Sequence, residues 1–372
     1  MKRQDLSNAQ IYNTPFSKAY WCDAAAQLFD VRILCIAAIM IAIRVALKPL
    51  QIDIAPTLSI QIGFFINALS AAIIGPVVAS IGAFVSDTLG VFVAGDPWIP
   101  IFAIVEIAGS LIFSLMLWRT KFSASRIILS RFFVILVCNI LLNPLLIYLT
   151  YNSAGKGYSY FLVSGAVKNA ALFPVEAILL VLFFGLLVPV MVKVKVIPKM
   201  QTKPELHKKH IALIASLLVA SVVCVGAYCE FYLPTQSVSQ SVTKENLKLT
   251  LKSDQRGYKI NKANPDAPLS LTATLKNTST TDEIDISYGY TWCDIKLVHK
   301  DGIVIPSQKF DDEENSMVIA PEKNIKFNDT FAWEWEQMGA LPRGKYTAVA
   351  EVEITVDGEP VSLEVELPIK IK

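Results

Sequence analysis

The chain has 372 residues, of which 53% are hydrophobic and only 18% are charged, and its mean hydropathy is +0.47. This balance lies outside the usual range of soluble domains and favours an integral membrane protein. The formal net charge of +2 identifies no class of partner, and we expect no nucleic-acid partner. Residues 31–193 hold few charges, whereas residues 243–372 are rich in Asp, Glu, Lys and Thr, so the chain combines two physical regimes.

The apolar part of the sequence predicts seven membrane-spanning helices. A span needs about 20 predominantly apolar residues, and residues 1–30 contain no such core, so we predict a cytosolic N-terminal segment there. The second and third predicted spans are divided only by Gly75-Pro76, a pair typical of turns. The predicted spans are residues 31–48, 59–75, 76–95, 98–118, 127–150, 165–193 and 210–233.

Clusters of Lys and Arg predict the orientation of these spans. The segments after the fourth and sixth spans, WRTKFSASR and the loop 194–209, are basic, and short basic loops stay in the cytosol. We therefore expect Met1 in the cytosol and residues 234–372 outside. The loops PLQIDIAPTL, AGDPW and YNSAGKGYSY then face outward.

Beyond the seventh span, residues 234–246 are predicted to be a polar linker. Residues 247–372 contain alternating runs such as LSLTATLKN, KYTAVAEVEITV and VSLEVELPIKI, separated by turn pairs such as Asp301-Gly302. Alternation with a period of two, at regular spacing, favours an all-β sandwich.

Few ionisable residues lie within the predicted spans, and each is costly enough to need a partner or a role. We single out Arg44, Asp87, Glu106, Lys168 and Glu176 as the ionisable residues at bilayer depth. Arg44 and Lys168 fall in the outward portions of their spans, so a cavity between them would suit an anionic solute. The structural alternative is that Arg44 pairs with Asp87 or Glu106 and holds the helices together, and the residues alone leave both open.

The first predicted span carries Ala38, Ala42 and Ala46 at a spacing of four residues. On a helix, Arg44 lies roughly 160–200° away from Ala42 and Ala46. Small residues in this pattern allow another helix to approach closely in lipid. The residues alone favour packing inside the bundle over docking of a partner.

Several motifs of enzymes and motors are absent from the sequence. Two of the three histidines, His207 and His299, lie outside the predicted spans, and His210 is the first residue of the seventh. The six cysteines form no CxxC pair, and no GxxxxGK[ST] motif occurs. We therefore expect no catalytic residues, no metal and no cofactor. If the chain moves a solute uphill, the energy must come from another subunit or from coupled ions.

Four phrases carry a resemblance to a known family. They are RILCIAAIMIAIRVAL, IGPVVASIGAFVSDTLGVFVAGDPWIPIFAI, NILLNP and VKNAALFPVEAILLVLFF. In these phrases the six-helix region 31–193 resembles the S components of energy-coupling factor (ECF) vitamin transporters, most closely the folate type. The resemblance implies a substrate-capturing subunit that binds a folate-like molecule and is energised by partner proteins.

The same resemblance implies roles for individual residues. It lends Ala38, Ala42 and Ala46 the role of docking on an ECF coupling subunit, which carries two cytosolic ATPase subunits in trans. It implies a substrate site between the outer ends of the helices. The substrate-binding residues implied there are Arg44 and Lys168 for carboxylates, Asn143, Asn169 and Asp87 for the ring edge, and Trp98 for stacking.

The outer domain resembles the BsuPI-like intracellular proteinase inhibitor domain through the phrase FAWEWEQMGALPRGKYTAVAEV. The resemblance implies an immunoglobulin-like sandwich, in which we expect Trp333 and Trp335 to be core residues. Two other functions remain open at this stage. As alternatives to a transporter subunit, the chain could be a membrane-anchored binding or adhesion protein that acts through the outer sandwich, or a solitary ion-coupled transporter.

Overall fold

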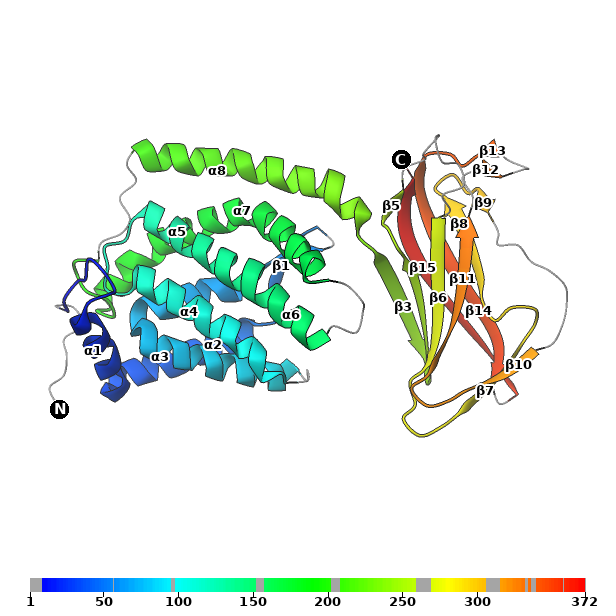
Figure 1. Ribbon diagram of the computed structural model, residues 1–372, viewed down its shortest axis with the longest axis horizontal. Helices are drawn as coiled ribbons and strands as arrows, with labels where there is room; N and C mark the ends of the chain where they lie inside the picture. Colours follow the sequence, from blue (N-terminus) through cyan, green and yellow to red (C-terminus); the bar gives the residue numbers. More distant parts are fainter. Residues whose placement is uncertain are drawn as a thin grey trace. The chain divides into compact units, whose positions relative to one another are not determined.

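The computed structural model describes residues 9–55, 57–94, 98–151, 157–201, 208–258, 269–305, 315–331, 334–335, 339–356 and 358–371. The chain divides into two compact units, Met1–Tyr228 and Cys229–Lys372. The first is built mainly of helices and the second mainly of strands (Figure 1).

The helical unit consists of helices and one short β-hairpin. Its helices are α1 (Lys18–Ala26), η2 (Gln27–Phe29), α2 (Val31–Leu47), α3 (Gly63–Ala94), η3 (Pro100–Phe102), α4 (Ala103–Leu117), α5 (Ala124–Val134), the π-helix η4 (Ile135–Leu142), α6 (Asn143–Tyr151), α7 (Tyr158–Lys193) and α8 (Lys208–Ala227). The hairpin consists of β1 (Gln51–Ala55) and β2 (Leu58–Gln61), which pair antiparallel. Residues 59–61 are therefore strand, and the helix predicted from residue 59 begins at Gly63.

Within the described residues, five helical stretches are long and apolar enough to cross a membrane. They are Gly63–Val93, Pro100–Leu117, Ala124–Tyr151, Tyr158–Lys193 and Lys209–Thr235. The helix α2 has 17 residues, which is about the lower limit for a span. Several apolar helices thus suit a membrane helical bundle, and the number of seven spans stays a prediction.

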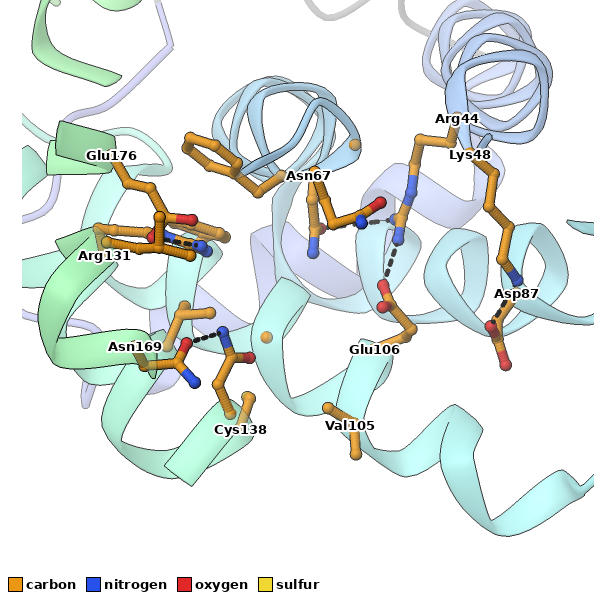
Figure 2. A pocket seen from close by; sticks show the side chains of 18 of the residues that line it. Arg44, Lys48, Asn67, Asp87, Val105, Glu106, Arg131, Cys138, Asn169 and Glu176 are labelled. Atoms are coloured by element: carbon orange, nitrogen blue, oxygen red, sulfur yellow. Dashed lines mark hydrogen bonds and ion pairs between the residues drawn. The ribbon is translucent and has the colours of Figure 1, made fainter. Parts of the chain in front are cut away.

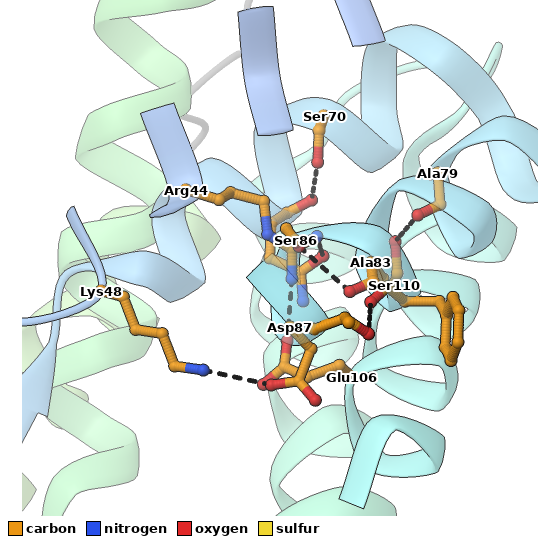
Figure 3. Close-up of polar contacts among 12 residues, drawn as sticks. Arg44, Lys48, Ser70, Ala79, Ala83, Ser86, Asp87, Glu106 and Ser110 are labelled. Atoms are coloured by element: carbon orange, nitrogen blue, oxygen red, sulfur yellow. Dashed lines mark hydrogen bonds and ion pairs between the residues drawn. The ribbon is translucent and has the colours of Figure 1, made fainter. Parts of the chain in front are cut away.

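The helix α3 folds back on itself at Gly75, where φ is 74° and ψ is 172°. On α4, the hydroxyl of Ser114 donates to the carbonyl of Ala71. The hydroxyl of Ser110 donates to the carbonyl of Ala79 (Figure 3). Neighbouring turns of α4 therefore contact both sides of Gly75. A straight helix would place residues 67 and 87 about 30 Å apart, yet both line one cavity. The Gly75-Pro76 pair divides α3 into two halves.

We predict that Gly75→Ala lowers the free energy of unfolding by about 1–3 kcal/mol, because only Gly adopts this backbone conformation without strain. An added Cβ would also lie 2.7 Å from Cε2 of Trp118. The matched control is Gly185→Ala in α7, where nothing lies within 4 Å of an added Cβ. That change should stabilise the helix by up to about 1 kcal/mol. Denaturation in detergent measures both, and equal effects would contradict the strained turn.

The N-terminal segment packs against the end of α4. Tyr12, Tyr20, Ala24 and Trp118 form a buried cluster, in which the Tyr20 and Trp118 rings meet edge to face at 4.9 Å. The Tyr20 hydroxyl donates to the carbonyl of Ser114 at 3.2 Å. Part of the segment predicted over residues 1–30 is therefore ordered against the bundle.

The second unit contains two main sheets whose inward side chains form one core. The four-stranded sheet has the order β11 (Asn324–Phe331), β6 (Leu269–Asn277), β4 (Leu247–Ser253) and β3 (Val238–Lys244). The larger sheet contains β10 (Asn315–Ile319), β7 (Ile284–Tyr288), β14 (Gly344–Val356), β15 (Glu359–Ile371), β5 (Gly257–Tyr258), β8 (Asp294–His299) and β9 (Val304–Ile305). Two further short strands, β12 (Glu334–Trp335) and β13 (Gly339–Ala340), pair with each other.

The expected alternation is clear in these strands. In β6 every second residue from Leu269 to Asn277 is buried, which is why two sheets close over a common core. The predicted linker 234–246 differs from the structure, because β3 occupies Val238–Lys244 and pairs with β4. The immunoglobulin-like topology stays a prediction, and Trp333 and the Trp335 side chain lie outside the described part of the chain.

Candidate functional site

A cavity of about 320 Å³ lies within the helical unit. This volume is at the lower end of the range of small-molecule sites, about 300–1,000 Å³. Its walls come from α2, β2, α3, α4, α5, η4 and α7 (Figure 2). The reversal of α3 at Gly75 is what brings Asn67 and Asp87 to the same cavity.

Three ion pairs line this cavity. Arg44 contacts Glu106 at 2.8 Å, Lys48 contacts Asp87 at 3.2 Å, and Arg131 contacts Glu176 at 2.8 Å (Figures 2 and 3). Each of these cations thus has a carboxylate partner within the wall. The described ionisable side chains in the lining therefore balance in charge, and the site is polar without a net excess of either sign.

The three pairs differ in their exposure. The Arg131 and Glu176 side chains are only 6% and 5% exposed, whereas Glu106 is 43% exposed although Arg44 is 10% exposed. Arg131 also donates a second hydrogen bond to Glu176 from Nε at 3.1 Å, and its guanidinium lies 4.2 Å from the centre of the Phe64 ring. The Arg131–Glu176 pair is a fixed element of the wall, while Glu106 can leave Arg44 at low cost in solvation.

Amide side chains add donors and acceptors to the same wall. Asn139 donates to the Asn169 side chain at 2.9 Å, and Asn169 donates to the carbonyl of Gly165 at 2.8 Å. The Asn67 side chain accepts from Arg44 at 3.5 Å. Because an amide both donates and accepts, this set can bind the polar edge of a heterocycle.

The structure brings three of the predicted substrate-binding residues together and separates the others from them. Arg44, Asp87 and Asn169 line the cavity, whereas Trp98, Asn143 and Lys168 are not among its lining residues. Trp98 is 41% exposed and its ring lies 6.3 Å from that of Phe92. The structural alternative for Arg44, a pair with Glu106, is present.

Sequence reasoning missed several polar residues of the cavity, among them the cations Lys48 and Arg131 and the amides Asn67 and Asn139. Arg131 lies inside the predicted span 127–150, so its position at membrane depth could have indicated that it needs a partner or a role. Lys48 ends the first predicted span, where a cation is usually taken to reach the membrane surface. The two asparagines had no such signal, because polar uncharged residues are tolerated within spans.

The alanines of α2 are exposed on the surface of the helical unit. Ala38, Ala42 and Ala46 are all exposed, while Ile33 and Ala37 on the same helix are buried. Packing inside this chain, which the residues alone favoured, is therefore wrong for these three positions. A smooth strip of small side chains remains on the outside of α2.

No family model matches the chain. Residues of this chain are 25% identical over 151 positions to the folate transporter FolT of Clostridium novyi (strain NT), an alignment that covers 40% of this chain and 86% of that protein. A crystal structure of FolT bound with folic acid is 23% identical, with a TM-score of 0.36 and coverage of 40% and 88%. The ApaA protein from Bordetella pertussis is 10% identical, with a TM-score of 0.20 and coverage of 37% and 90%.

The first of these relatives bears on the helical part of the chain. The five apolar helices agree with a membrane protein, and the relative is a transporter rather than an enzyme. The N-terminal part of the chain resembles a folate transporter of the ECF S-component type.

Proposed function

We propose that the helical unit is the substrate-capturing subunit of an ECF vitamin transporter and that its cavity binds folate or a related anionic compound. The observation that carries the proposal is a polar cavity with Arg44 in its wall, in the part of the chain that resembles a folate transporter. The predicted topology supports it, with a cytosolic N-terminus and residues 234–372 outside.

The existing ion pairs determine which side chain of the wall a ligand carboxylate contacts. Each of the three cations in the wall already contacts a carboxylate. A ligand carboxylate would therefore place a second negative charge beside one cation unless it displaces that cation's partner. Glu106 is the most exposed of the three carboxylates, at 43% against 15% for Asp87 and 5% for Glu176. The ligand carboxylate therefore takes the place of Glu106 on Arg44, with a charge-assisted hydrogen bond.

The amides and Asp87 are the proposed contacts of the ligand ring. Asn139 and Asn169 form a hydrogen-bonded pair on one wall, and Asp87 lies on another with Lys48. Contacts from Trp98, Asn143 and Lys168 require a ligand that extends beyond the described cavity, as a folate with its glutamate tail would. Lys168→Gln then weakens binding of folate but not of a pterin without the tail.

Energy for uptake is proposed to come from partner subunits. The sequence contains no phosphate-binding loop of the GxxxxGK[ST] type, so ATP hydrolysis belongs to two ATPase subunits that act through a coupling subunit. The exposed strip Ala38, Ala42 and Ala46 is the proposed docking face for that subunit, since small side chains permit close helix packing in lipid.

We predict that Ala42→Phe lowers the rate of uptake at least about tenfold, because an aromatic ring on the strip prevents close approach of the partner helix. Binding of folate to the purified chain should stay within about twofold of wild type, since Ala42 does not line the cavity. Uptake of labelled folate by cells that contain the ECF module measures the first quantity, and equilibrium binding in detergent measures the second.

The matched control is Ile39→Phe, which places the same ring at an exposed position on α2 outside the strip. Uptake by this variant should match that of wild type. If Ala42→Phe transports normally, or if both variants fail alike, the proposed docking face is wrong. If wild type takes up folate in cells without any ATPase partner, the proposed energy source is wrong.

A further inference from the structure

The outer face of the four-stranded sheet is cationic and contains no apolar side chain. The register of β3, β4, β6 and β11 places 14 side chains on this face. Ten of them are Ser, Thr or Asn, and none of the 14 is a carboxylate. The other four are Lys248, Lys252, Lys276 and Lys326. We call this set the lysine face.

The arrangement of these lysines is unfavourable for the isolated sheet. Lys248 lies directly opposite Lys276 on the neighbouring strand, and like charges in that position repel. On the larger sheet, by contrast, Lys296 pairs with Glu351, and Glu364 and Glu366 are also exposed. Among the residues that the structure describes, no carboxylate pairs with these four lysines, so an external anion is a candidate to supply the opposite charge.

The shape of the lysine face selects the kind of anion. From Lys252 to Lys248 along β4 is about 13 Å, and the two strand steps from β4 to β11 add about 10 Å across the sheet. Four ammonium groups spread over a flat area of this size match a plane of charges better than one small anion. A protein partner would need apolar groups at the centre of its interface, and the lysine face offers none.

The chain connects this sheet directly to a candidate span. The apolar helical stretch Lys209–Thr235 ends only three residues before β3 begins at Val238, a distance of about 10 Å of extended chain. The strand β3 belongs to the sheet that carries the lysine face. We propose that the lysine face binds the phosphate headgroups of an anionic bilayer, so that the β-rich unit lies against the membrane that its own helix α8 enters.

This proposal is tested with the full chain in nanodiscs that hold one copy each. Amine acetylation read by mass spectrometry gives the reaction rate of each lysine. In discs with about 30 mol% phosphatidylglycerol, the four lysines should react at least about threefold more slowly than in neutral phosphatidylcholine, because phosphates attract lysines near the surface. About 0.5 M NaCl should remove the difference by screening. Lys300, Lys345 and Lys370, exposed on the other sheet, should react equally in both discs.

A pair of matched variants separates bilayer binding from local shielding. In Lys248→Gln/Lys252→Gln/Lys326→Gln, the remaining Lys276 should lose its lipid-dependent protection. In the control Lys300→Gln/Lys345→Gln/Lys370→Gln, Lys276 should keep it. Equal rates in neutral and anionic discs overturn the proposal, as does protection that persists in the first variant. Protection that appears only in discs assembled with two copies, and not in anionic discs with one copy, also overturns it. None of these readouts involves folate or uptake.

Discussion

Arg131→Met is expected to lower the free energy of unfolding by about 3–5 kcal/mol, because it leaves a buried carboxylate without its partner. Glu176 is 5% exposed, and both hydrogen bonds from Arg131 go to the same carboxylate oxygen, at 2.8 and 3.1 Å. Reversible unfolding of the ligand-free protein by sodium dodecyl sulfate in mixed micelles measures the change.

Two further variants test whether the loss of stability in Arg131→Met comes from the unpaired charge of Glu176. Arg131→Met/Glu176→Leu removes both charges, and its stability should return to within about 1 kcal/mol of wild type, as for other buried pairs replaced by apolar residues. Lys48→Met breaks a pair whose lysine is 42% exposed, and its effect should stay below about 1 kcal/mol. A double variant as unstable as Arg131→Met would show that the arginine acts by packing on Phe64 rather than by its charge.

Arg44→Gln is expected to weaken folate binding about 10- to 150-fold, which corresponds to the loss of one charged hydrogen bond of about 1.5–3 kcal/mol. The guanidinium is 10% exposed and lies within the cavity wall, so water replaces it poorly. Equilibrium binding of folate to the purified chain measures the change. Lys48→Gln is the control of equal charge change at a more exposed pair, with an expected loss below about fivefold.

The proposed exchange of carboxylates on Arg44 also predicts the direction in which a change at Glu106 shifts the affinity for folate. Glu106 contacts Arg44 at 2.8 Å, so it competes with a ligand carboxylate for the same guanidinium. Glu106→Gln should therefore tighten folate binding, whereas a structural role of the pair alone predicts weaker binding. Tighter binding in Glu106→Gln together with weaker binding in Arg44→Gln identifies Arg44 as the carboxylate contact.

The helical bundle and the strand-rich unit could be predicted from the sequence because their patterns are local. Long apolar stretches indicate spans, and strict alternation, as in Leu269–Asn277, indicates strands. The hairpin β1–β2 was missed because Leu58–Gln61 continues an apolar stretch into α3 without a break. The strand β3 was missed because only Val238 and Val242 of VSQSVTK are apolar, and its pairing with the buried strand β4 defines it.

The cavity could be predicted only in part, because its contacts join residues that are distant in sequence. Glu106 is 62 residues from Arg44, and Glu176 is 45 residues from Arg131. A position inside a span shows that an ionisable group needs a partner, but the packing of the helices decides which partner it meets. The same packing keeps Lys168 and Asn143 out of the lining although Asn169 is part of it.

The identity of the small molecule that remains bound to the purified full-length chain tests the central claim most directly. Extraction of the detergent-purified protein, followed by mass spectrometry, should release a folate in amounts approaching one per chain. The Arg44→Gln variant purified in parallel should release much less. Recovery of a neutral or cationic compound in place of a folate, at the same level from both proteins, would contradict the assignment of the cavity.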